Sequence, residues 1–153
     1  MATWKQQALI DAPVERIWAL LADPDTYAAW AGDVIEVTGA PTRIEKGSSF
    51  QQTSPGPIRG EMTTTFMVEE LEDLREIKLR CQASGYYSHW WLTEAQGQTF
   101  ADVELGVEPI GLHGQVARML MTKRTLRQVT EESLDGIRKA CDQPPPGGAS
   151  ARE

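Results

Sequence analysis

Histidine and tyrosine side chains in the segment 86–94 are of types that transfer protons in enzymes. His89 has an unperturbed pKa of about 6.5, which suits a general acid or base near neutral pH. Tyr86 can donate a hydrogen bond to a ligand carbonyl, and Tyr87 carries the same group. We therefore take His89 and Tyr86 as candidate catalytic residues for an acid–base step on an enolisable substrate. The alternative is that His89 lies on the outer face of a sheet or is satisfied by a neighbour.

The face that this segment turns inward decides which of these groups meet a ligand. Side chains alternate along a strand, so Trp90, Leu92, Tyr86 and Ser88 share one face. We favour that face as the inner one, because Leu92 is the natural core residue next to the turn. A slip of one position would reverse the assignment and turn the other set inward: Tyr87, His89 and Trp91.

Parity along the other strands extends the candidate ligand site. Phe66 and Val68 predict that Met62 and Thr64 also face inward. Aromatic rings after the first helix can stack on a flat ligand ring at the mouth of a cavity, or can simply pack in the core. The predicted ligand-binding set is Tyr27, Trp30, Phe50, Gln52, Met62, Thr64, Phe66, Leu79, Cys81, Ser88, Trp90 and Leu120.

The order of elements that must position these groups is one strand, two short helices, six further strands and a long helix. A strand at Thr3–Ile10 leads into a helix at Pro13–Ala22, whose apolar residues recur at i, i+3, i+4 and i+7. A second short helix follows at Asp25–Trp30. Strands are predicted at 34–38, 48–53, 60–70, 76–83, 86–94 and 99–108, and a long helix at about Gly114–Cys141.

Consecutive antiparallel strands joined by short hairpins, with helices at both ends, predict an α+β fold. The long C-terminal helix has only the sheet as a partner for its apolar side. A curved sheet wrapped around one helix tends to leave a space between them, and such a space usually accommodates a small apolar molecule. An internal binding site for a small apolar molecule is therefore the main functional inference from the residues.

Composition limits the other classes of function. The chain has 153 residues, which fits one domain over 1–141, and Pro144–Gly148 predicts a disordered tail at 142–153. A net charge of −7 argues against nucleic acid and disfavours anionic membrane surfaces. A local basic patch on the last helix stays open, at Arg118, Lys123, Arg124 and Arg127.

Metal and redox chemistry have little basis in this sequence. Cys81 and Cys141 predict two reduced thiols, and no His/Cys motif predicts a metal site. No cofactor is expected. The chain shows no signal-peptide pattern and no apolar run long enough to cross a bilayer. We expect a cytoplasmic protein without integral membrane association, either a monomer or a homodimer.

The opening of the chain resembles a known superfamily. The run from Asp11 to Trp18, DAPVERIW, is similar to the opening of START-like, or SRPBCC, proteins. Asp23 and Trp30 fit the family's spacing after that opening, and Gly47 fits the glycine before its third strand. Further matches lie at 97–99 and at the end of the last helix, so the resemblance covers about residues 3–141.

The resemblance implies a helix-grip fold, in which a seven-stranded antiparallel sheet curves around a long C-terminal helix. Members bind lipids, sterols and polyketides in an internal cavity. Some are cofactor-independent polyketide cyclases or dehydratases. The expected function is therefore the binding of a polyketide- or lipid-like molecule, with cyclase or dehydratase activity left open. The alternative is a non-catalytic carrier, sensor or self-resistance binder of an apolar metabolite.

Overall fold

The structure is a computed structural model, and it describes residues 3–56 and 59–142. The element order begins with a strand, continues through a helical segment and six strands, and ends in two helices. The bounds are β1 (Thr3–Ile10), α1 (Val14–Leu21), η1 (Pro24–Thr26), α2 (Tyr27–Trp30), β2 (Glu36–Thr38), β3 (Ser49–Pro55), β4 (Glu61–Glu72), β5 (Glu76–Cys81), β6 (Tyr86–Ala95), β7 (Gln98–Val107), α3 (Gly111–Leu120) and α4 (Lys123–Cys141).

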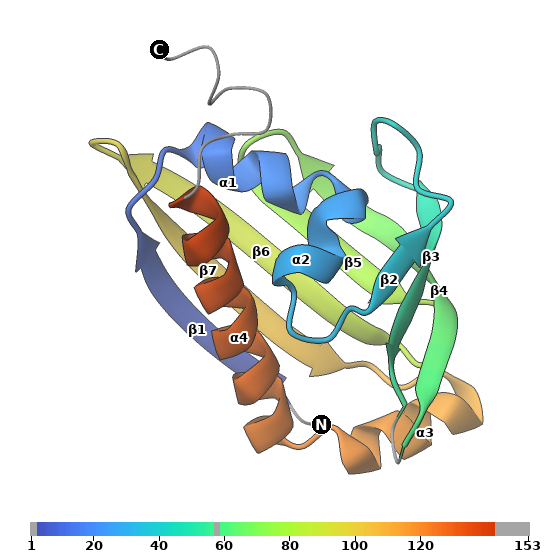
Figure 1. The fold of residues 1–153 in the computed structure, drawn as a ribbon. Helices are drawn as coiled ribbons and strands as arrows, with labels where there is room; N and C mark the ends of the chain where they lie inside the picture. Colours follow the sequence, from blue (N-terminus) through green and yellow to red (C-terminus); the bar gives the residue numbers. More distant parts are fainter. Residues whose placement is uncertain (1–2, 57–58, 143–153) are drawn as a thin grey trace.

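Seven strands form one antiparallel sheet in the order β1-β7-β6-β5-β4-β3-β2. From β2 to β7 each strand pairs with its successor, and β1 closes the sheet by pairing with β7. Figure 1 shows α1, α2 and α4 on one face of this sheet, while α3 lies at one end. The predicted α+β helix-grip fold is confirmed, with two short helical segments after the first strand.

Alternation of side chains along the strands separates a core face from an outer face. In β5, Ile77, Leu79 and Cys81 are buried, while Lys78 and Arg80 point the opposite way. The β4–β5 ladder shifts register between Val68 and Glu70, which makes Glu69 the residue of a β-bulge. The bulge brings the Glu69 carboxylate to the two cations of β5.

The first helix packs on the sheet through the predicted apolar face. Its buried residues are Val14, Ile17, Trp18 and Leu21. No side chain of the helix's own N-terminal segment caps it. Instead Glu94, at the far end of β6, accepts a hydrogen bond from the Val14 N–H at 2.7 Å. This contact satisfies a donor that the helix geometry leaves without a partner.

The predicted long C-terminal helix is present as α4, but residues 111–120 form a separate helix, α3, so the predicted start at Gly114 is wrong. Met121 takes a non-helical ψ of 82°, and Thr122 starts α4 by accepting a hydrogen bond from the Thr125 N–H at 3.2 Å. The break has a physical reason. Threonine favours the N-cap position, where its hydroxyl satisfies a backbone N–H of the first turn, so Thr122 supplies a start for a separate helix.

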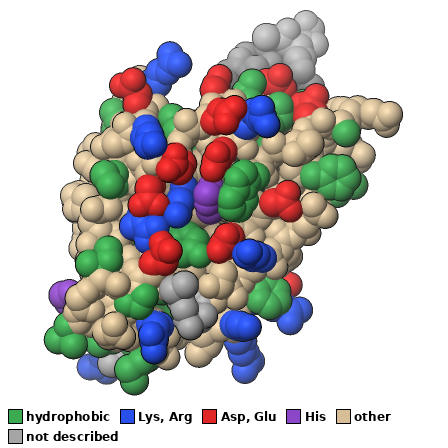
Figure 2. All heavy atoms as spheres, turned by 180° about the vertical axis from the view of Figure 1, so that it is seen from behind, with side chains coloured by type: hydrophobic (Ala, Val, Ile, Leu, Met, Phe, Trp, Pro, Cys, Tyr) green, Lys and Arg blue, Asp and Glu red, His purple; other side chains and the backbone are tan. Residues whose placement is uncertain are grey.

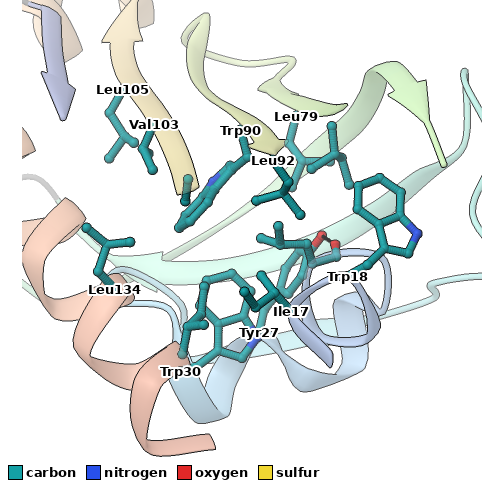
Figure 3. Packing of buried hydrophobic residues seen from close by; sticks show 14 of the residues in the cluster. Ile17, Trp18, Tyr27, Trp30, Leu79, Trp90, Leu92, Val103, Leu105 and Leu134 are labelled. Atoms are coloured by element: carbon teal, nitrogen blue, oxygen red, sulfur yellow. Dashed lines mark hydrogen bonds between the residues drawn. The ribbon is translucent and has the colours of Figure 1, made fainter. Parts of the chain in front are cut away.

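The core is formed between the inner face of the sheet and α1, α2 and α4. Figure 3 shows Ile17, Tyr27 and Trp30 from the helical side facing Trp90 and Leu92 of β6. The predicted tail lies outside the described residues, apart from its first residue, Asp142. Within the described residues, no helix is both long and apolar enough to span a membrane.

Candidate functional site

A cavity lies between the inner face of the sheet and the helical layer. Residues from α1, α2, the loop 31–34, the sheet and α4 line it, namely Leu21, Tyr27, Trp30, Ala31, Asp33, Val34, Gln52, Phe66, Ile77, Leu79, Tyr86, Ser88, Trp90, Leu105, Val129 and Ser133. Its volume is about 40 Å³. That is room for a few water molecules, whereas pockets for small-molecule ligands hold roughly 300–1,000 Å³.

The open space expected from the sequence is therefore largely filled by the protein's own side chains. Aromatic rings account for much of the filling. The Trp30 ring lies edge-on to Tyr27 at 5.3 Å between centroids and edge-on to Trp90 at 6.0 Å. Phe66 lies edge-on to Tyr86 at 6.5 Å. Edge-to-face pairs of this kind are favourable contacts, so in this conformation the rings pack against one another.

One carboxyl group lies in the wall of this mostly apolar cavity. Asp33 precedes β2, and its Oδ2 accepts a hydrogen bond from the Tyr86 hydroxyl at 2.9 Å. Burial raises the pKa of the Asp33 carboxyl, and the hydrogen bond from Tyr86 opposes that rise only in part. Burial, together with the nearby Asp33 charge, raises the pKa of Tyr86 well above its usual value. Among residues 3–56 and 59–142, no Lys or Arg forms an ion pair with Asp33.

Close packing of the loop 31–34 on α4 positions Asp33. The Gly32 N–H donates to the Ser133 hydroxyl at 2.9 Å. A Cβ at Gly32 would lie 2.9 Å from the Glu132 Cβ, and a Cβ at Gly136 would lie 2.3 Å from the Trp30 carbonyl oxygen. Glycine is needed at both positions because no larger residue allows the loop to approach the helix this closely.

Other polar groups in the lining are few. Gln52 is buried, and its amide donates to the Ser54 hydroxyl at 3.1 Å. Ser88, Ser133 and Tyr27 contribute further hydroxyl groups; Ser133 already accepts from Gly32, and Tyr27 donates to the Leu21 carbonyl. A mostly apolar wall with a small number of hydrogen-bonding groups is the usual chemistry of a site for an apolar ligand. Within the described residues, no cluster of three metal-ligating side chains is found.

The structure brings together eight of the residues that the sequence singled out. The cavity is lined by Tyr27, Trp30, Gln52, Phe66, Leu79, Tyr86, Ser88 and Trp90. Phe50 and Cys81 are buried but lie outside the lining, with Phe50 stacked on Phe66 at 6.2 Å. The Cys81 thiol donates to the Thr64 hydroxyl at 3.5 Å. Met62 and Leu120 are about two-fifths exposed, so neither contributes to the cavity.

His89 does not lie in the cavity, so pairing it with Tyr86 as a second catalytic candidate was wrong, and the alternative of a histidine on the outer face holds. The inner face of β6 carries Tyr86, Ser88 and Trp90, and alternation sends His89 to the outer face. There its Nε2 lies 2.6 Å from the Glu76 carboxylate, and its ring stacks on Trp91 at 3.7 Å. The histidine therefore has local partners on the face away from the helices.

The outer face of the sheet holds a network of charges. Figure 2 shows acidic and basic side chains gathered on this face. Arg80 makes two hydrogen bonds to the Glu69 carboxylate, at 2.6 and 2.9 Å, and also pairs with Glu108. Lys78 lies 2.9 Å from Glu69. These contacts, chiefly those from Arg80, lower the pKa of Glu69 to about 2.

Asp33 is the functional candidate that the sequence reasoning missed. In the sequence pattern the residue is only the position before a predicted strand at 34–38, and that strand begins at Glu36. The sequence does contain a signal for a polar partner. Asp33 lies between Ala31 and Val34, and a carboxylate buried among such residues is costly unless another group pairs with it. Nothing local identified Tyr86 as that partner, because 53 positions separate the two residues.

Comparison with known proteins agrees with this architecture. The chain matches the START superfamily protein from Mycobacterium smegmatis with a TM-score of 0.70 and 13% identity, over 94% of this chain and 99% of that one. A Nitrosomonas europaea protein, NE0264, gives a TM-score of 0.71 at 12% identity, over 93% and 95%. At these identities the likeness establishes the fold alone.

A third structure is the di-domain ARO/CYC StfQ from the steffimycin biosynthetic pathway. Its TM-score is 0.65 at 15% identity, and the match covers 92% of this chain but only 50% of StfQ. A search of curated proteins finds no match. Residues 1–142 match the protein family described as "polyketide cyclase / dehydrase and lipid transport". With its START-like sheet, its gripped C-terminal helix and this match over nearly its whole length, the chain belongs to the polyketide cyclase / dehydrase and lipid transport family.

Proposed function

We propose that this protein binds a polyketide- or lipid-like small molecule between the sheet and α4, and holds one ligand oxygen at the Asp33–Tyr86 pair. The observation that carries the proposal is this hydrogen-bonded pair in an apolar wall. Family membership and the similarity to a polyketide aromatase/cyclase support the class of ligand. We place this function in the cytoplasm, in a monomer or a homodimer.

The proposed ligand cannot enter the cavity in its present size, so binding must displace side chains. The rings of Trp30 and Trp90 contact each other in the lining, and α2 carries Trp30 on only one turn of helix. A rotation of Trp30 exchanges ring–ring contacts for ring–ligand contacts of similar strength. We therefore expect opening at α2 and the loop 31–34, with the sheet unchanged.

The raised pKa of Asp33 gives the pair a hydrogen-bond donor for the ligand. When Asp33 is ionised, the single hydroxyl hydrogen of Tyr86 is already committed to the carboxylate. When Asp33 is protonated, the pair has a second hydrogen and can donate it to a carbonyl oxygen. Binding of a ketone should therefore weaken as the pH rises through the pKa of Asp33.

The fluorescent ketone prodan tests this proposal, because its emission shifts to the red when its carbonyl accepts a hydrogen bond. We expect saturable binding to the wild-type chain, with affinity falling as pH rises. Tyr86→Phe should lower the affinity by about fivefold, the loss of one hydrogen bond, and shift emission to the blue. Asp33→Asn should remove the pH dependence, since the amide does not titrate.

Cavity-filling variants distinguish internal binding from surface binding. Val129→Trp adds a large side chain to the cavity wall, and Ser88→Leu adds a smaller one at the sheet. Both should abolish saturable prodan binding. Gln128→Trp is the matched control on the exposed side of α4. Equal binding by Val129→Trp and Gln128→Trp, with both folded by circular dichroism, would remove the internal site.

Catalysis is the second candidate, and the same carboxyl group favours it. In its ionised form Asp33 can take a proton from an activated methylene of a poly-β-ketone. The enolate carbon then attacks a second carbonyl, whose oxygen takes a proton from Tyr86, and the Tyr86 oxygen recovers a proton from the protonated Asp33 beside it. The test is turnover of a synthetic poly-β-ketone thioester, which Asp33→Asn should slow by about 100-fold or more. A wild-type rate equal to the uncatalysed rate would exclude catalysis on this substrate and favour the alternative, a non-catalytic carrier, sensor or self-resistance binder.

A further inference from the structure

Helix α3 presents its large apolar side chains away from the protein. Leu112, Val116 and Met119 recur at i, i+4 and i+7, which places them on one face. Leu112 is 82% exposed and Met119 78% exposed. The only buried residue of the helix is Gly114, on the opposite face, where the chain packs against Pro109 and the Ser84 carbonyl.

An unpartnered apolar face of this kind is unusual in a globular protein. Among residues 3–56 and 59–142, nothing covers the side chains of Leu112 and Met119, which are more than three-quarters exposed. The face therefore fits a partner outside this chain.

The charge around this face is basic in an otherwise acidic protein. Residues 109–130 contain four Lys or Arg and no Asp or Glu, in a chain of net charge −7. Arg118, Lys123 and Arg124 are exposed, and within residues 3–56 and 59–142 none of them forms an ion pair. Figure 2 shows hydrophobic and basic side chains together at the lower end of the molecule, where α3 lies.

This combination argues against a symmetric dimer through α3. A two-fold interface would bring two copies of this basic patch together, with six cations from Arg118, Lys123 and Arg124 and no carboxylate from residues 109–130 to pair with them. Like charges brought together in this way oppose association. A partner that offers hydrocarbon and negative charge side by side meets both features of the patch.

We propose that α3 and the first turn of α4 form an interfacial element that docks on the surface of an anionic phospholipid bilayer. Leu112, Val116 and Met119 would insert at the boundary between headgroups and acyl chains. Arg118, Lys123 and Arg124 would lie at the level of the lipid phosphates and carboxylates. The net negative charge of the remaining surface would orient the protein with α3 toward the bilayer.

Vesicle flotation of the full chain tests this proposal. We expect binding to vesicles of phosphatidylcholine with 30% phosphatidylserine, little binding to phosphatidylcholine alone, and loss of binding in high salt. Arg118→Glu/Lys123→Glu/Arg124→Glu should lower the partition coefficient by about 30-fold or more. Leu112→Ser/Met119→Ser should lower it by about tenfold or more.

Matched controls exist on other surfaces. Leu9→Ser/Phe100→Ser removes two exposed apolar side chains that are cross-strand neighbours on the sheet. Lys46→Glu/Arg75→Glu/Lys139→Glu makes the same change in net charge at exposed sites elsewhere. Both controls should bind vesicles within about twofold of wild type if attachment is local to α3.

Several outcomes would overturn the proposal. Absence of flotation with anionic vesicles would do so, as would equal losses in the α3 variants and their controls. Sedimentation that shows a wild-type dimer, abolished by Leu112→Ser/Met119→Ser, would assign the face to a second copy instead. Saturable, lipid-independent binding of an acidic amphipathic peptide that displaces the vesicles would assign it to a protein partner.

Discussion

Tyr86 and Tyr87 are neighbours on β6, and their side chains lie on opposite faces of the sheet. Each donates its hydroxyl hydrogen to a carboxylate on its own face. Tyr86 bonds to Asp33 at 2.9 Å on the inner face, and Tyr87 bonds to Glu104 at 2.7 Å on the outer face. The chemical pairs are the same, so the difference between them comes from their surroundings.

The surroundings differ in the supply of cations. On the outer face the Lys78 ammonium and the Arg80 guanidinium lie 5.0 and 5.4 Å from the centre of the Tyr87 ring. The same cations hold the pKa of Glu69 at about 2. On the inner face burial dominates and the pKa of Asp33 rises. Glu69 therefore stabilises the fold as an anion, whereas Asp33 is the group that we propose for proton transfer and ligand binding.

The largest expected contrast is in packing. Trp90→Ala removes a buried ring that contacts Trp30, and should lower the free energy of unfolding by about 3–5 kcal/mol. Trp91→Ala removes the same side chain from the outer face, where it stacks on His89, and should cost about 1 kcal/mol. Urea denaturation measures both. Equal losses would show that the two faces contribute alike.

The outer network should give a pH-dependent loss of stability. The folded pKa of Glu69 lies below its ordinary value of 4.5, so its contribution is complete above about pH 4.5 and disappears as the pH falls to about 2. Because Glu69 is partly exposed, Glu69→Gln should cost roughly 1–2 kcal/mol at pH 7. Glu70→Gln, which loses only an exposed pair with Lys46, should cost under about 0.5 kcal/mol.

The inner carboxyl group, Asp33, should change the stability of the fold with pH in the opposite direction. Its folded pKa is raised, so its burial as an anion destabilises the fold increasingly as the pH rises above its ordinary value of 3.8. Asp33→Asn should therefore raise the free energy of unfolding by about 1 kcal/mol at pH 7 and have little effect below pH 4. Thermal unfolding at the two pH values checks this. A loss of stability at pH 7 would mean that the Asp33 anion stabilises the fold, contrary to this expectation.

The smallest expected effect concerns His89. Because its ring lies on the outer face with Glu76 and Trp91, His89→Gln should change the prodan affinity by less than about twofold. Tyr86→Phe, three positions earlier and on the inner face, is the comparison. A larger effect of His89→Gln than of Tyr86→Phe would mean that the outer face takes part in binding.

The sequence by itself determined the order of elements and the faces of most strands. Period-two alternation is written in neighbouring residues, so the inner positions of β5 could be identified without coordinates. The apolar spacing of α1 and the DAPVERIW run are local in the same sense, and they indicated the fold and the family. Local periodicity also placed Tyr86 and Trp90 together on one face.

Only the tertiary structure decided the pairing of Asp33 with Tyr86, the break at Met121–Thr122 and the volume of the cavity. Each depends on residues far apart in the chain. Helix α3 packs at Gly114 against the Ser84 carbonyl, at one end of the sheet and apart from α4, and the cavity shrinks because rings from α2, β4 and β6 converge. Side-chain periodicity specifies a direction from the backbone, whereas distances and volumes follow from the packing of whole elements against one another.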